Sequence, residues 1–138
     1  MLILNGHMDV VPPGDESRWA YSPFSGKVVE GRIYGRGATD MKGGLAVIMM
    51  VFTELAPIIE KRGSGTLILS ATADEETGGH PGVEALVRDG VLIGDAAIVA
   101  EPREAIGTTL VRRVSARLSL SQGVGLPTVA YQSSAITP

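Results

Sequence analysis

The stretch LILNGHMD at residues 2–9 begins with three aliphatic residues and ends with two polar side chains, His7 and Asp9. A short apolar run of this kind is typical of a strand that is buried on both faces, as in a parallel sheet. Residues two apart in an extended segment point to the same side, so His7 and Asp9 are expected to face together. Asp9 would then orient the His7 ring while the free ring nitrogen binds a metal, although the segment alone also fits a polar strand end.

Strand and helix patterns alternate along the next ninety residues. Residues 26–34 predict a small hairpin around Glu30 and Gly31, because β-branched and aromatic residues flank a turn. After Gly43 the apolar residues fall on one helical face, and Pro57 is expected to end or kink that helix. The inward residues are predicted to be Leu45, Ile48, Met49, Phe52 and Leu55. The remaining elements are predicted as a strand at Thr66–Ala73, a helix at Pro81–Val91 and a strand at Asp95–Ala100.

This alternation predicts an α/β fold with a parallel or mixed sheet, whose ligands bind at the carboxyl ends of the strands. A side chain able to bind a metal follows each predicted strand. Asp40 is a further one, in the glycine-rich stretch that precedes the long helix. These side chains are His7 and Asp9 after the first strand, Glu75 and Glu76 after the second, and Glu101 after the third. We therefore expect them to converge on one edge of the sheet.

The adjacent carboxylates of Glu75 and Glu76 would repel each other unless a cation or a proton separates their roles. One as a metal ligand and the other as a general base would resolve the repulsion. Taken alone, the acidic pair also fits a loop that caps the following helix.

Composition narrows the classes of function. The net charge of −3 provides no basic surface for nucleic acid, and the absence of cysteine leaves His, Asp and Glu as metal ligands. No apolar run approaches the roughly 20 residues of a membrane span and no signal peptide is evident, so a soluble cytoplasmic protein is expected. Residues 1–102 carry 8 basic and 14 acidic side chains, whereas residues 103–138 carry 4 basic and 1 acidic.

Four segments together resemble the metal-site motifs of one family of dinuclear zinc peptidases and deacylases. That family includes acetylornithine deacetylase, succinyl-diaminopimelate desuccinylase, aminoacylase and carboxypeptidase G. The segments are NGHMDVVP at residues 5–12, GRGATDMKGG at 35–44, ADEETGG at 73–79 and AEP at 100–102. The resemblance covers roughly residues 2–102. It implies a three-layer α/β fold, with a mostly parallel sheet and helices on both faces, of which this chain holds an incomplete part.

The resemblance also implies a role for each motif residue. His7 and Glu101 would bind one metal, Asp40 would bridge two metals, and Glu76 would bind the second. Asp9 would orient His7, and Glu75 would serve as general base and proton shuttle. The two ions would be divalent, with zinc expected and cobalt an alternative, and the bond between Asp40 and Met41 would be cis. The implied substrates are N-acyl amino acids or small peptides, and the implied partner in full-length relatives is a second copy of the chain.

The chain departs from the family pattern after residue 102. The family has a downstream histidine as the last ligand of the second metal, and His80, the only other histidine here, is expected on the surface instead. Residues 1–102 are therefore interpreted as a partial metallohydrolase domain, and residues 103–138 as a divergent or poorly ordered tail in which 110–120 could form a strand. Missing neighbours would leave Leu2–Leu4 at a sheet edge.

Three hypotheses stay open from the sequence. The chain is a metal-dependent amide hydrolase, or a non-catalytic fragment that retains at most one metal site, or an acidic interaction module without metal.

Overall fold

The computed structural model describes residues 1–102 and 112–114, which contain a four-stranded sheet in the order β4-β1-β5-β6. Strand β1 (Leu2–His7) pairs in parallel with β4 (Leu67–Thr72) on one side and with β5 (Ala96–Val99) on the other. Strand β6 (Arg112–Val114) pairs antiparallel with β5. The predicted α/β fold with a mostly parallel sheet is confirmed.

Strand β1 occupies the middle of this sheet, so the expectation of an edge position for Leu2–Leu4 is wrong. Ile3 and Leu4 are buried at 5% and 3% exposure. The reason is that β4 and β5 both come from later in the chain and flank β1 in parallel register. The aliphatic run therefore forms the centre of the core.

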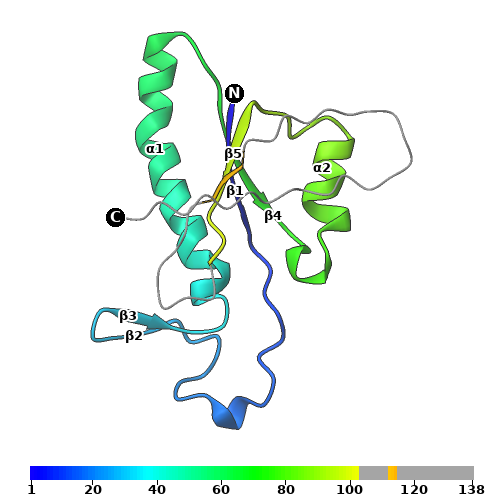
Figure 1. Cartoon of the computed structure of the whole chain (residues 1–138). Helices are drawn as coiled ribbons and strands as arrows, with labels where there is room; N and C mark the ends of the chain where they lie inside the picture. The colour runs from blue at the N-terminus through cyan, green and yellow to red at the C-terminus, as the bar shows by residue number, and fades with distance from the viewer. Residues whose placement is uncertain (103–111, 115–138) are drawn as a thin grey trace.

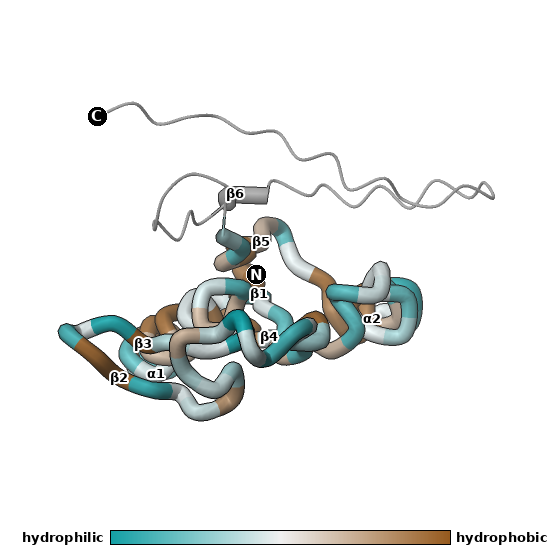
Figure 2. The backbone as a smooth tube through the Cα atoms, turned by 90° about the horizontal axis from the view of Figure 1, so that it is seen from below, coloured by the Kyte–Doolittle hydropathy of each residue, from teal (hydrophilic) through white to brown (hydrophobic). Residues whose placement is uncertain are grey.

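Helix α1 (Gly44–Arg62) packs along β1 and β4 on one face of the sheet. The short α2 (Ala85–Arg88) lies on the other side (Figures 1 and 2). The core between α1 and the sheet is small and consists of Leu4, Met41, Leu45, Ile48 and Ala100, with Phe52 packed against it.

The boundaries of α1 differ in part from the prediction. The helix continues through Pro57 and ends at Gly63, whose backbone N–H donates to the carbonyls of Ile59 and Glu60 from a left-handed conformation with φ of 67°. Met49 and Leu55, which were predicted to face inward, are 47% and 37% exposed. The apolar surface of α1 is thus wider than the face that the described part of the sheet covers.

The hairpin is confirmed as β2 (Lys27–Val29) and β3 (Arg32–Tyr34). Its two-residue turn has positive φ at both Glu30 (48°) and Gly31 (74°), the geometry that suits the twist of two-residue hairpins. Figure 1 shows the hairpin beyond the N-terminal end of α1, on the side of the sheet where β1 ends.

The predicted helix at 81–91 is shorter and kinked. A π-helical turn (His80–Glu84) precedes α2, and Gly82 interrupts it with ψ of −114°. Short 3-10 turns occur at Glu16–Arg18 and Glu75–Thr77, and a π-helical turn at Ala38–Gly43 leads into α1. The strand considered at 110–120 is present as β6, and the rest of that range lies outside the described residues.

The stretch Ala38–Arg62, which is kinked at Asp40 and Met41, is long and apolar enough, by length and composition alone, to cross a membrane. The sequence expectation that no such run exists is therefore wrong on this criterion. A mostly buried core helix passes the same test, whereas only 17% of the apolar window is buried here, where α1 packs against the sheet through one face.

Candidate metal centre

The carboxyl ends of three neighbouring strands bring the acidic side chains to His7. His7 is the last residue of the central strand β1, Glu75 follows β4, and Glu101 follows β5. Asp40 approaches from the π-helical turn before α1. The parallel topology thus gathers side chains that are 94 positions apart in sequence at one edge of the sheet.

Nε2 of His7 lies at the centre of this group. It is 3.1 Å from Oδ1 of Asp40, 3.7 Å from Oε2 of Glu101 and 3.8 Å from Oε2 of Glu75. The His7 side chain is 1% exposed, whereas the carboxylates are accessible from solvent. One ligand atom from each of His7, Asp40 and Glu101 lies within 4.8 Å of the others, a spacing that can hold one metal ion. We call these three residues the metal cluster.

The other ring nitrogen of His7 fixes the ring through the backbone of Asp9. Nδ1 lies 3.1 Å from the carbonyl oxygen of Asp9, which can only accept, so Nδ1 carries the proton. The Asp9 carboxylate is also near, with Oδ1 3.3 Å from Nδ1 and without a hydrogen bond among the described residues. Its Oδ2 accepts the backbone N–H of Glu76 at 3.1 Å. Asp9 therefore holds both the ring and the loop that carries Glu75.

The donor set suits a cation. Both nitrogens of His7 face oxygen atoms that are acceptors, and a neutral imidazole has only one N–H to offer. The contact between Nε2 and Asp40 is thus favourable only with a second proton on the ring or with a cation between the two groups. Neutral imidazole and carboxylate oxygen are ligands that zinc accepts, as in sites of two histidines and a glutamate.

The pKa values show the same crowding of negative charge. Burial raises the pKa of Glu101 to about 7, and the charges of Asp40 and Glu75 add to the effect while His7 opposes it. Burial by itself lowers the pKa of His7, but the hydrogen bond to Asp40 and the charges of Glu101 and Glu75 outweigh it and raise the pKa. A bound divalent ion would relieve this repulsion.

Asp9 behaves differently from the cluster. Burial tends to raise the pKa of Asp9, but the backbone N–H of Glu76 and further backbone hydrogen bonds outweigh this and lower it. Asp9 is therefore held as a carboxylate, which suits a residue that orients an imidazole.

Glu76 and His80 do not join the metal cluster in the part of the chain that the structure describes. The only three-residue group there with metal-ligand spacing contains neither of them. Nδ1 of the exposed His80 instead pairs with Glu84 one helical turn away, at 2.5 Å. This agrees with the expectation of a surface position for His80.

The structure adds contacts that the sequence reasoning missed. The fully buried Met41 accepts the backbone N–H of His7 through its sulfur at 3.2 Å, and Lys42 donates to the carbonyl of Met8. The bond between Asp40 and Met41 is cis, as the resemblance implied. The sequence indicates these contacts only through the position of Met41 and Lys42, which directly follow Asp40 in the glycine-rich stretch.

Comparison with known proteins now identifies the family. A profile of peptidase family M20/M25/M40 matches residues 3–136. The chain belongs to this peptidase family. The match extends past residue 102, where the motifs quoted above end.

Within peptidase family M20/M25/M40, the chain is similar to succinyl-diaminopimelate desuccinylase of Paracoccus denitrificans (strain Pd 1222). The two are 45% identical over 104 residues, which make up 71% of this chain and 26% of the relative. The chain thus spans only about a quarter of the length of the relative that it matches.

Proposed function

We propose that the chain carries the metal-binding part of a metal-dependent hydrolase that cleaves amide bonds of N-acyl amino acids or small peptides. The single observation that supports it most is the group of three carboxylates within 3.8 Å of Nε2 of a buried histidine. Family membership and the similarity to a desuccinylase support the same class of reaction.

In this proposal His7, Asp40 and Glu101 hold one divalent ion. Asp40 and Glu76 are ligands of a second divalent ion. Zinc is the expected metal, with cobalt as the alternative, because the donors are nitrogen and oxygen. The metal supplies Lewis acidity, which polarises the scissile carbonyl and makes water a stronger acid.

Glu75 is proposed as the general base. Its carboxylate faces the same ring nitrogen as the metal cluster, yet it lies outside the three-residue group with ligand spacing, and it is about half exposed. It is therefore free to take a proton from water and to return it to the leaving amine. Asp9 keeps the His7 ring and the Glu75 loop in place.

The test uses the full 138-residue chain with zinc or cobalt and N-succinyl and N-acetyl amino acids as substrates. Amine release should fall by roughly 10²–10⁴-fold in Glu75→Gln, because a general base contributes about that factor. Calorimetry should show unchanged metal binding in this variant. The exposed Glu60→Gln on α1 is the matched control, and release that survives Glu75→Gln would contradict the proposed role.

A second candidate is a non-catalytic chain with one metal site. It is favoured by the single three-residue metal group in the described residues. It predicts one ion per chain in the same calorimetry and no amine release with any of the substrates. The proposed location is the cytoplasm, in line with a small-molecule substrate.

A further inference from the structure

The end of strand β1, where His7 lies, is paired with a neighbouring strand on one side only. Pairing with β4 continues to His7, which lies opposite Thr72. Pairing with β5 ends two residues earlier, where Asn5 lies opposite Val99. Successive residues of a strand in a parallel sheet turn their backbone groups to opposite neighbours, and the carbonyl of Asn5 accepts from Ala100 on the β5 side. The N–H of His7 therefore points to the side where β5 has ended.

Met41 supplies the acceptor that β5 no longer provides. Its Sδ accepts the backbone N–H of His7 at 3.2 Å. Met41 is fully buried and packs in the core with Leu4 and Leu45. A thioether sulfur is a weak acceptor, but a buried backbone N–H without any partner costs free energy. The sulfur of Met41 thus satisfies the backbone of a residue of the metal cluster.

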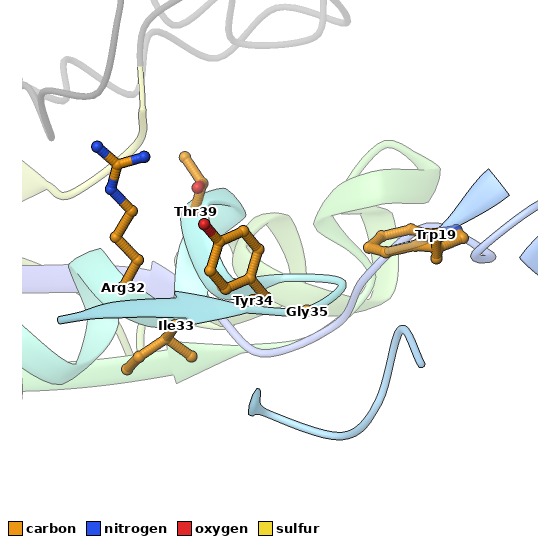
Figure 3. Close-up of a pocket in the computed structure, with 7 residues that line it drawn as sticks. Trp19, Arg32, Ile33, Tyr34, Gly35 and Thr39 are labelled. Atoms are coloured by element: carbon orange, nitrogen blue, oxygen red, sulfur yellow. The ribbon is translucent and has the colours of Figure 1, made fainter. Parts of the chain in front are cut away.

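The glycine-rich turn that carries Asp40 lies between open space and the core. Ala38 and Thr39, before Asp40, line a cavity of about 770 Å³ together with Trp19 and β3 (Figure 3). The side chain of Asp40 is 52% exposed. Met41, which follows at once, is 0% exposed. Met41 is therefore the side chain of this turn that is enclosed by the core and fixed to β1.

Two contacts join this turn to the same residue of β1. Oδ1 of Asp40 lies 3.1 Å from Nε2 of His7, and Sδ of Met41 lies 3.2 Å from the backbone nitrogen of His7. Asp40 and Met41 are consecutive, so a movement of Met41 relative to His7 also moves the Asp40 carboxylate. The spacing of His7 and Asp40 thus depends on where the sulfur of Met41 lies.

We propose that Met41 is a positioning residue, whose thioether sulfur sets the spacing of His7 and Asp40 for the metal ion. The proposal rests on the metal site of the proposed function. Gly6 contributes to the same arrangement, because a Cβ built on Gly6 would lie 2.8 Å from Cε of Met41. A larger residue at position 6 would therefore displace the end of the Met41 side chain.

The contact between Met41 and His7 is tested without metal, by amide hydrogen exchange of the full chain in EDTA. Met41→Leu keeps a similar apolar volume but removes the acceptor. The His7 amide should then exchange roughly three- to tenfold faster than in the wild type, the factor that one hydrogen bond is worth. The amide of Asn5, in the same strand, reports the overall stability and should change much less.

The effect on the metal is measured by calorimetry with zinc. Met41→Leu should raise the dissociation constant of zinc about tenfold, as expected for a group that supports a metal ligand. The matched control is Ile3→Val, which shortens a buried side chain of the same strand outside the core cluster of Met41. It should leave the dissociation constant of zinc unchanged.

Gly6→Ala is a second, independent variant, because it keeps the sulfur but displaces Met41. It should also weaken zinc binding, and it carries the test if circular dichroism shows that Met41→Leu does not fold.

The positioning role is overturned if the His7 amide of Met41→Leu exchanges no faster relative to that of Asn5. It is equally overturned if zinc binds Met41→Leu as tightly as the wild type, or if Ile3→Val weakens zinc binding as much. Failure of the proposed function is recognised separately, because the wild-type chain itself would then bind no zinc. Zinc binding that is equal in the wild type and Met41→Leu would defeat the positioning role alone.

Discussion

Glu101 is the residue at which burial and like charge act together most strongly. Its pKa is raised from 4.5 to about 7 by burial first, then by Asp40. A carboxyl whose folded pKa exceeds its unfolded pKa contributes stability that is complete below the unfolded value. That contribution is lost as the pH rises through the folded value. The free energy of unfolding of the metal-free chain should therefore decline between about pH 4.5 and 7.

Replacing Glu101 by Gln should remove most of this decline, because glutamine does not titrate. Thermal unfolding in EDTA from pH 4.5 to 8 measures how the free energy of unfolding changes with pH. Glu60→Gln is the control and should show the same pH dependence as the wild type. Some slope should persist near neutral pH, since the raised pKa of His7 acts in the same direction. Equal slopes for wild type and Glu101→Gln would show that Glu101 is not the titrating group.

Asp9 is expected to act mainly on the Glu75 loop. Its Oδ2 accepts the N–H of Glu76, whereas the His7 ring bonds to the backbone carbonyl, which a substitution leaves in place. Asp9→Ala should therefore lower amine release by about 10–100-fold, the usual effect of losing such a supporting group. Metal affinity should change less. Asp9→Asn retains an acceptor and should recover part of the rate, and an equal loss in both variants would contradict this role.

The sequence predicted the proximity of His7 and Asp9 but not the atom that makes the hydrogen bond. Alternation of side chains holds only inside a strand, and β1 ends at His7. Beyond that point the backbone of Asp9 turns its carbonyl toward the ring. The path of a chain after a strand depends on tertiary contacts such as the one from Lys42 to Met8, which no local pattern encodes.

At the scale of elements, the first turn of α1 packs directly on the end of β5. A Cβ built on Gly44 would lie 2.3 Å from the carbonyl oxygen of Ala100 and 3.0 Å from its Cβ. Ala100 is 1% exposed and precedes Glu101, so this close approach also positions a residue of the metal cluster.

Gly44→Ala should destabilise the chain by about 1–3 kcal/mol, the usual range for overpacking. The sign of this change in the free energy of unfolding is informative. Without the close contact, alanine would stabilise the helix, because alanine is favoured over glycine inside helices by about 1 kcal/mol. Urea denaturation measures the effect, and Lys61→Ala in the exposed last turn of α1 should stay within about 0.5 kcal/mol of wild type. An increase in stability for Gly44→Ala would mean that α1 does not approach Ala100 this closely.

Elements with strong local signals were predictable, and those that depend on packing were less so. The hairpin followed from its turn residues, and β4 and β5 from their aliphatic runs. Pro57 did not end α1, which continues to Arg62 although its buried residues, Gly44, Leu45 and Ile48, all precede the proline. The kink at Gly82 follows from close contact, since a Cβ there would lie 2.0 Å from the carbonyl oxygen of Ala73.

At the scale of the whole molecule, α1 covers the sheet with one face and leaves the other apolar face uncovered by described residues. Val47, Val51 and Ile58 fall within one stripe of that face and are 51%, 39% and 61% exposed. Apolar surface of this kind marks a site of contact with other protein. Such a surface is expected to cause self-association of the 138-residue chain in solution.

The double variant Val47→Lys/Ile58→Lys should therefore shift the chain toward the monomer in sedimentation over a series of concentrations. The two positions are three helical turns apart on one side of α1, so the charges interrupt the whole stripe. Val28→Lys on the hairpin is the matched control, since Val28 is also exposed (64%) but lies outside α1. Metal binding should be the same in all three proteins, because Ile48 and Leu45, not the outer stripe, face the core beneath the metal cluster. Association that persists in the double variant would place the contact elsewhere, with the open edge of β4 in the described sheet as the next candidate.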